Sequence, residues 1–285
     1  MPISLPSLRT EHDRDIARLA VPAFGTLIAE PLYVLADTAI VGHLGTTQLA
    51  GLALASTVLL TIHALMIFLA YGATGRVARL LGAGESKAAA ERSLQGLWLA
   101  VILGTGTMVT LWLTGPALIG VLGGDNPTVA AAAERYLSIS AWGVPSMLVL
   151  LAANGSFHGR QNTRLPLVLA VSGALINLVI EMVLIIGLEY GIGASALATV
   201  IAQTLTALVA AALLVPWARR TGASVAPDPV EMMSALRAGS ALVLRTAALR
   251  GSFTLSVAVA ARIGVAAVAA HQIALQVWGL LALAL

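Results

Sequence analysis

The chain has 285 residues, of which 59% are hydrophobic and only 10% are charged, and its mean hydropathy is +0.93. Soluble domains carry roughly 25% charged residues, so this composition predicts an all-α polytopic membrane protein. The net charge of +3 is too small to indicate a surface for nucleic acid, and the absence of cysteine excludes disulfides, thiolate metal sites and a thiol nucleophile.

Windows of about 20 apolar residues between polar breaks predict eight membrane helices. These helices cover residues 16–43, 48–75, 89–114, 128–157, 165–188, 193–217, 235–262 and 266–285. The first is expected to be retained rather than cleaved, because its N-terminal flank has mixed charge and its apolar span is too long for a signal peptide.

The first apolar stretch, residues 20–45, contains two carboxylates, Glu30 and Asp37, and two prolines, Pro22 and Pro31. A carboxylate near the centre of a bilayer costs at least ~2.5 kcal/mol, so such groups usually face a bundle interior or a wet cavity. The two carboxylates are seven residues apart and share one helix face, and the prolines are expected to kink the helix. We therefore predict a bent helix that presents ionisable groups to a solvated cavity. The alternative for either carboxylate alone is a solvated position at a helix end.

Two later helices carry further candidates. Gly155 and Gly159 form a GxxxG pair, which we interpret as a site of close helix packing rather than of dimerisation. Arg250 lies too deep in the seventh predicted helix to reach the membrane surface, so we expect it to face the cavity or a carboxylate of a second lobe.

Basic residues occur in every other loop between the predicted helices. They precede the first predicted helix and follow the second, fourth and sixth, whereas the loops after the first, third and fifth contain no Lys or Arg. Basic residues of short loops stay on the cytoplasmic side. The pattern predicts a multi-pass protein of the cell (inner) membrane with a cytoplasmic N-terminus.

An internal repeat appears when the chain is shifted by 219 residues, which is 237 minus 18: Arg18 then pairs with Arg237, and Leu44-Gly45 with Ile263-Gly264. Parallel repeats of this kind are a known plan of transporters. We expect an N-terminal six-helix lobe at 1–218, a cytoplasmic linker at 219–234, and the start of a pseudo-symmetric C-terminal lobe at 235–285. On this plan the sequence is a C-terminally truncated piece of a twelve-helix protein.

Four stretches, spread over nearly the whole chain, resemble the multidrug and toxic compound extrusion (MATE) transporters, most closely their DinF-like branch. They are AEPLYVLADTAIVGHLG (29–45), GRQNTRLPL (159–167), INLVIEMVLIIGLEYGIGASALATVIAQ (176–203) and AARIGVAAVAAHQIALQVW (260–278). The resemblance implies a V-shaped pair of six-helix lobes that exports organic, often cationic, compounds by alternating access in exchange for H⁺ or Na⁺. It implies no cofactor beyond this coupling ion, and we expect a monomer in the lipid bilayer with a small organic substrate and no nucleic-acid partner.

The resemblance also implies an ion-coupling set. It assigns the aspartate of helix one to Asp37, the Asn-x-x-x-Asp pattern of helix five to Asn177 and Glu181, and a threonine of helix six to Thr199. The sequence departs from the family pattern at Glu181, whose extra methylene leaves the site geometry and the choice between H⁺ and Na⁺ open. These four residues could supply the oxygen ligands of Na⁺.

Helical depth supports the same grouping. Asp37 and Glu181 each lie 17 residues beyond the cytoplasmic start of their helix (37 − 20 and 181 − 164), or about 25 Å. Asn154 falls nearer the inner end of its helix and is a candidate substrate contact, together with Glu30, Asp37 and Arg250.

Competition between a proton and a cationic substrate at the two carboxylates would couple their fluxes, because neighbouring carboxylates in a poorly hydrated cavity favour a bound proton. A flippase for lipid-linked precursors shares the lobe plan and is the alternative function, for which a more cationic cavity is expected. An intramembrane enzyme is disfavoured, because the sequence lacks HExxH, GxSxG and aspartate-rich motifs.

Overall fold

The computed structural model describes residues 11–122, 126–263, 270–271, 274–275 and 277–278. All regular structure in this part of the chain is helical. In chain order the helices are α1 (Glu11–Gly42), α2 (Thr46–Met66), α3 (Phe68–Gly82), α4 (Ser86–Leu122), α5 (Pro127–Ser140), a 3₁₀ turn η1 (Ala141–Gly143), α6 (Val144–Gly159), α7 (Arg164–Glu181), a π-helix η2 (Met182–Gly187), α8 (Gly193–Arg220) and α9 (Pro229–Ile263).

Five helical segments of the described chain are long and apolar enough to cross a membrane. They are Thr46–Gly82, Ser86–Leu122, Pro127–Gly159, Arg164–Gly187 and Gly193–Arg220, and α1 adds the shorter apolar helix Leu32–Gly42. The predicted spans 16–43 and 235–262 are helical, as α1 and α9, but are not among the five. Arginines are spread along α9, and the side chains of residues 11–17, 27 and 29–31 in α1 are outside the described residues. The predicted span 266–285 lies largely outside the described residues.

The predicted breaks need correction at three places. The second span continues to Gly82, past the predicted end at residue 75, and divides at Ile67 into α2 and α3. The fourth is divided by η1, and the fifth ends as the π-helix η2. Hydropathy does not reveal these changes of helix type, because the apolar run continues through each of them.

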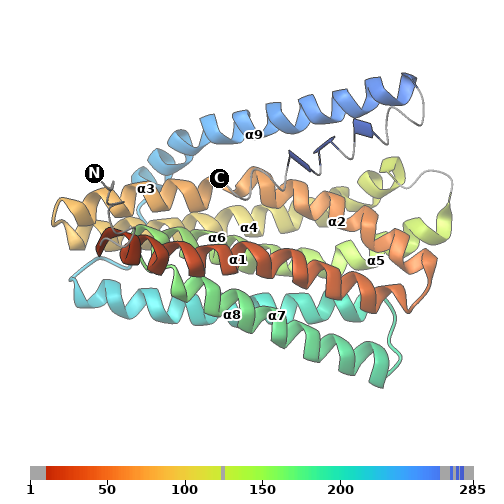
Figure 1. Cartoon of the computed structure of the whole chain (residues 1–285), viewed down its shortest axis with the longest axis horizontal. Coiled ribbons are helices and arrows are strands. Elements are labelled where there is room, and N and C mark those ends of the chain that lie inside the picture. The colour runs from red at the N-terminus through yellow and green to blue at the C-terminus, as the bar shows by residue number, and fades with distance from the viewer. Residues whose placement is uncertain (1–10, 123–125, 264–269, 272–273, 276, 279–285) are drawn as a thin grey trace, which may run out of the picture.

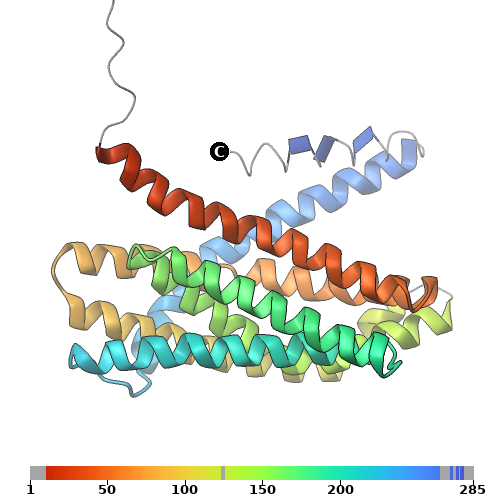
Figure 2. The same cartoon turned by 60° about the horizontal axis from the view of Figure 1, so that its bottom comes forward.

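Helices α1 to α8 form one bundle whose loops lie alternately at its two ends (Figures 1 and 2). The loops after α3, α6 and α8 lie at one end, and those after α1, α4 and η2 at the other. In the core, α6 packs against α3, α4 and α8, while α1 packs on α7. The outward surface is rich in exposed large apolar side chains, as expected for a bundle that faces lipid.

Small residues allow the helices to approach closely. A Cβ at Gly155 would overlap the backbone of Ala70 on α3, and one at Gly159 would lie 2.8 Å from the carbonyl oxygen of Thr74. The GxxxG pair is therefore used in packing α6 on α3 within the chain.

Helix α9 separates from the bundle along its length (Figure 1). Its first turns pack on α2, α3 and α4, whereas every residue from Leu244 to Ser252 is exposed except Thr246, which is half-buried.

Candidate functional site

Two buried carboxylates meet where α1 packs on α7. Asp37 on α1 is 8% exposed, and Glu181, the last residue of α7, is fully buried. The two side chains are close enough to interact electrostatically. Both were expected at this depth from the sequence, and the structure brings them into one cluster.

Hydrogen bonds connect this cluster to α8. The hydroxyl of Ser195 donates to Asp37 Oδ1 at 2.8 Å, and Asn177 Nδ2 donates to Thr199 Oγ1 at 3.0 Å. Thr199 Oγ1 also lies 3.1 Å from the hydroxyl of Tyr33, and either of these two groups can be the donor. Thr199 therefore links α1, α7 and α8.

Glu181 lies within interaction range of Asp37 and Ser195, but it differs from its neighbours in that no described group is placed to donate a well-formed hydrogen bond to it. Neither of its carboxylate oxygens has a partner among the described residues, although buried polar groups are normally satisfied. A carboxylate buried in this way is stabilised when it binds a proton or a cation. The chain changes directly after Glu181 into the π-helix η2, a type of helix found frequently at functional sites.

A cavity of about 630 Å³ lies beside the cluster, within the size range of small-molecule sites. It is lined by residues of α1, α2, α5, α6, α7 and α8, most of them apolar. Its polar lining consists of Thr26, Tyr33, Asp37, Thr38, Ser56, His63, Tyr136, Ser140, Asn154, Asn177, Thr199, Gln203 and Thr206. None of the described lining residues is Lys or Arg, and Asp37 is acidic, so the wall suits a cation better than an anion.

Asn154 lines the same cavity as Asp37, although the depth estimate separated them. Its Oδ1 atom is buried and has no hydrogen-bond partner in the described part of the chain. This atom is therefore available to accept a hydrogen bond from a molecule in the cavity.

The other predicted residues lie apart from this cavity or have side chains outside the described residues. Pro22 lies within α1, which continues without interruption, and its carbonyl accepts a hydrogen bond from Thr26 Oγ1 at 3.0 Å. The side chains of Glu30 and Pro31 are outside the described residues. Arg250 is exposed on α9 and is not among the lining residues. The predicted kinks and the roles of Glu30 and Arg250 stay predictions.

Sequence reasoning missed three members of the cluster, Tyr33, Ser195 and Tyr136. Tyr33 lies one turn before Asp37 and Ser195 one turn before Thr199, so the i, i+4 rule applied to the candidates would have found them. Tyr136 is buried on α5 within electrostatic reach of Asp37, and nothing in the local sequence distinguishes it from a core aromatic residue.

The polar side chains of the cluster offer oxygen atoms and do not form a typical site for a transition metal. No group of three or more His, Asp or Glu residues that could hold a metal ion occurs in the described chain. The oxygens of Asp37, Asn177, Glu181 and Thr199 are nevertheless the type of ligand that hard cations prefer.

Comparisons with known proteins identify several relatives. The family model described as MatE matches residues 22–183. The chain is 31% identical to Protein DETOXIFICATION 44, chloroplastic, of Arabidopsis thaliana over 93% of its own length and 52% of that protein. It is 35% identical to DNA damage-inducible protein F of Escherichia coli K12 over 70% of its own length and 44% of that protein.

A similar solved structure is that of a MOP superfamily transporter from Pyrococcus furiosus. The TM-score is 0.80 at 26% identity, and the match covers 96% of this chain and 61% of the other. The chain spans about half the length of DETOXIFICATION 44 and of DNA damage-inducible protein F.

Proposed function

The chain belongs to the MatE family of membrane transporters, and on this premise we propose that it takes part in exporting organic, often cationic, compounds in exchange for inward-moving H⁺ or Na⁺. Membership makes it a multi-pass membrane protein related to DNA damage-inducible protein F and not an enzyme. Because the chain spans about half the length of these relatives, the proposed substrate, coupling ion and orientation refer to the whole transporter.

The observation that carries this proposal is the position of two buried carboxylates beside a large cavity that has no Lys or Arg among its described lining residues. A cationic substrate in the cavity and a proton at Asp37 or Glu181 would compete for the same negative charge. Proton entry would then weaken the hold on the substrate, and substrate binding would favour release of the proton. Such competition couples two fluxes without a chemical reaction.

The geometry within the cluster supports a division of roles. Asp37 lines the cavity and can contact substrate, whereas Glu181 is fully buried and is not among the lining residues. We therefore assign substrate and ion contact to Asp37, and ion binding to Glu181 with Asn177 and Thr199. Sodium is the rival ion, because these four residues offer oxygen ligands.

We further propose that the N-terminus is cytoplasmic and that the protein lies in the cell (inner) membrane as a monomer. Supporting residues are the basic ones at the end of the bundle that carries the loops after α3, α6 and α8, namely Arg76, Arg79, Lys87, Arg160, Arg164, Arg219 and Arg220. We also propose the division into a six-helix lobe at 1–218, a linker at 219–234 and the start of a second lobe at 235–285.

The alternative function is a flippase for lipid-linked precursors. Such a protein would need basic side chains for the phosphate groups of its substrate. The described cavity wall has no Lys or Arg and contains Asp37, which favours the exporter.

The test is efflux of a fluorescent cationic dye from energised cells that express the complete reading frame. We expect Asp37→Asn to lower the initial efflux rate by about tenfold or more, about 1.4 kcal/mol in the barrier. Efflux that stops with a proton uncoupler identifies H⁺ as the coupling ion, and efflux that requires external Na⁺ identifies Na⁺. Thr110→Ala, a change in an exposed residue of α4 that does not line the cavity, is the control and should leave the rate unchanged. If wild type exports no dye under either gradient, the exporter proposal is wrong and the flippase is preferred.

A further inference from the structure

The connection between α8 and α9 is attached to α4 by hydrogen bonds at residues 224, 225, 226 and 228. It comprises residues 221–228, and four side chains on one face of α4 contact it or the start of α9: Glu91, Arg92, Gln95 and Trp98. Their spacing of i, i+1, i+4 and i+7 places them along one face of the helix. We refer to these four residues with residues 224–231 as the clasp.

Gln95 lies at the centre of the clasp. It is 5% exposed, and its side-chain amide uses both of its functional groups on the linker backbone. Nε2 donates to the carbonyl of Ala226 at 2.9 Å, and Oε1 accepts from the amide N–H of Asp228 at 2.8 Å. A buried amide that is satisfied on both sides fixes the position of the backbone it binds.

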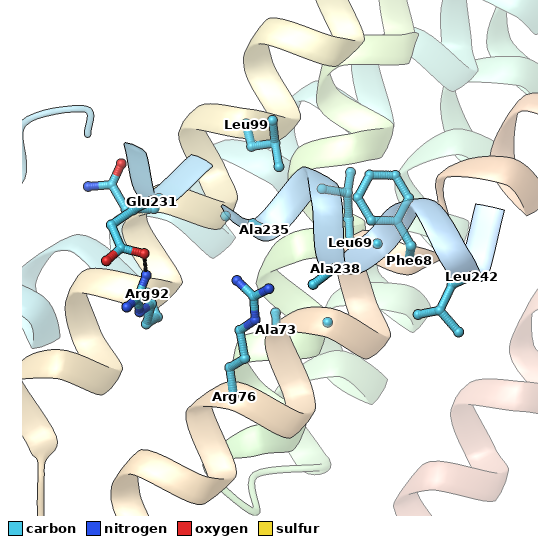
Figure 3. Close-up of a pocket in the computed structure, with 14 residues that line it drawn as sticks. Phe68, Leu69, Ala73, Arg76, Arg92, Leu99, Glu231, Ala235, Ala238 and Leu242 are labelled. Carbon is cyan, nitrogen blue, oxygen red and sulfur yellow. Dashed lines mark ion pairs between the residues drawn. The ribbon is translucent and has the colours of Figure 1, made fainter. Parts of the chain in front are cut away.

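The flanking contacts extend this fixed segment in both directions. Trp98 Nε1 donates to the carbonyl of Val225 at 2.9 Å, and Arg92 forms an ion pair with Glu231 in the first turn of α9 (Figure 3). Asp228 caps α9, because its Oδ1 accepts from the backbone N–H of Val230 at 2.9 Å. The linker is therefore continuous with a capped helix and is not a free tether.

The first turns of α9 are also packed on the bundle. Arg76 on α3 donates to the carbonyl of Ser234 at 3.2 Å, and a Cβ at Gly239 would overlap the buried ring of Phe68. The space left between α3, α4 and α9 is only about 70 Å³, far below the ~300 Å³ of a small-molecule site. This interface is therefore a packing contact, and it ends at Val243, beyond which α9 leaves the bundle.

Resting on the proposed function, we propose that Arg92 and Gln95 are positioning residues that keep residues 221–238 attached to the first lobe throughout the transport cycle. The hinge between the lobes then lies within α9 beyond Val243, where the packing on the bundle ends, and not in the linker. A linker that acted as the hinge would have to break the clasp in each cycle.

The first test is charge exchange at the ion pair. We expect Arg92→Glu and Glu231→Arg each to lower the rate of dye efflux by about fivefold, about 1 kcal/mol. The double variant is expected to restore the rate, because the pair re-forms with reversed charges. Arg79→Glu, the same charge reversal at an exposed residue of α3 outside the clasp, is the matched control and should leave the rate of dye efflux unchanged. Failure of the double variant to recover overturns the positioning role.

The second test locks the clasp. These 285 residues contain no cysteine. Once any cysteine elsewhere in the complete reading frame is replaced by serine, Arg92→Cys with Glu231→Cys creates a single thiol pair for a short bifunctional maleimide. We expect the uncrosslinked pair to transport slowly, like the single reversals, and the crosslinked pair to recover to within about twofold of wild type. A lock that abolishes transport in folded protein shows that the clasp must open, and it places the hinge in the linker.

The yield of the crosslink gives a readout that does not depend on transport. We expect the same yield at one fixed pH with and without Na⁺, dye or a proton uncoupler, because the clasp is closed in every state. A yield that falls in one of these conditions overturns the inference. If the wild-type protein exports no dye at all, the proposed function fails, while the yield still decides the question of the clasp.

Discussion

At the scale of single residues, Glu181 combines full burial with two unsatisfied carboxylate oxygens. Its charge lies within electrostatic range of Asp37, and a buried charge beside a like charge destabilises the folded state. We therefore expect Glu181→Gln to raise the thermal midpoint in detergent while it lowers ion-coupled efflux at least about tenfold. Glu181→Asp keeps the carboxylate and is expected to retain coupling. A Glu181→Gln protein that still transports would remove this residue from the coupling set.

Ser195→Ala, a second substitution in the same cluster, is expected to have the opposite effect on stability. It removes the donor to Asp37, so we expect it to lower the free energy of unfolding by about 1–2 kcal/mol, as measured by thermal denaturation in the same detergent. An unchanged midpoint would mean that another donor or water replaces the hydroxyl.

The same scale shows why the cluster could be predicted only in part. Asp37 and Glu181 are conspicuous because a carboxylate in an apolar helix requires an explanation. Ser195 and Tyr136 are unremarkable in the sequence, and only packing reveals their proximity to Asp37. Asn154 is predicted to lie nearer the inner end of its helix than the two carboxylates, yet the cavity extends far enough along the bundle to include it.

At the scale of elements, close packing of α6 on α3 depends on glycine. We expect Gly155→Ala to destabilise the protein by about 1–3 kcal/mol, because the added Cβ overlaps the backbone of Ala70. Gly106→Ala on α4, where nothing lies within 4 Å of the added Cβ, is the control and should stabilise slightly through helix propensity. Thermal denaturation in detergent measures both; equal midpoints would contradict the packing role of Gly155.

Most helices could be predicted from hydropathy because membrane helices must be long and apolar. The interruptions at Ile67, at η1 and at η2 could not, since they change the hydrogen-bond register of the backbone without changing the apolar character of the side chains. The length of the clasped linker was also overestimated: α8 ends at Arg220 and α9 begins at Pro229, so parts of the polar run 219–234 are helical.

At the scale of the whole molecule, the alternation of loops gives a test of orientation. Single cysteines can be introduced at Glu85, in the turn after α3, and at Tyr190, in the turn before α8. Each is then the sole thiol of these 285 residues, and any cysteine in the rest of the reading frame is replaced by serine. Both positions are exposed. With a cytoplasmic N-terminus, a membrane-impermeant maleimide should label Tyr190→Cys in intact cells and label Glu85→Cys only after permeabilisation. The reverse pattern would contradict the proposed topology.

The separation of α9 from the bundle has a consequence for biosynthesis. Most of the contacts that build the core of the bundle join helices between Glu11 and Arg220, so they can form in the membrane while α9 is still inside the ribosome. The clasp on α4 would then be the first surface that the emerging α9 meets. We expect the completed bundle to act as a template on which the next helix is inserted, so that the order of translation is also the order of assembly.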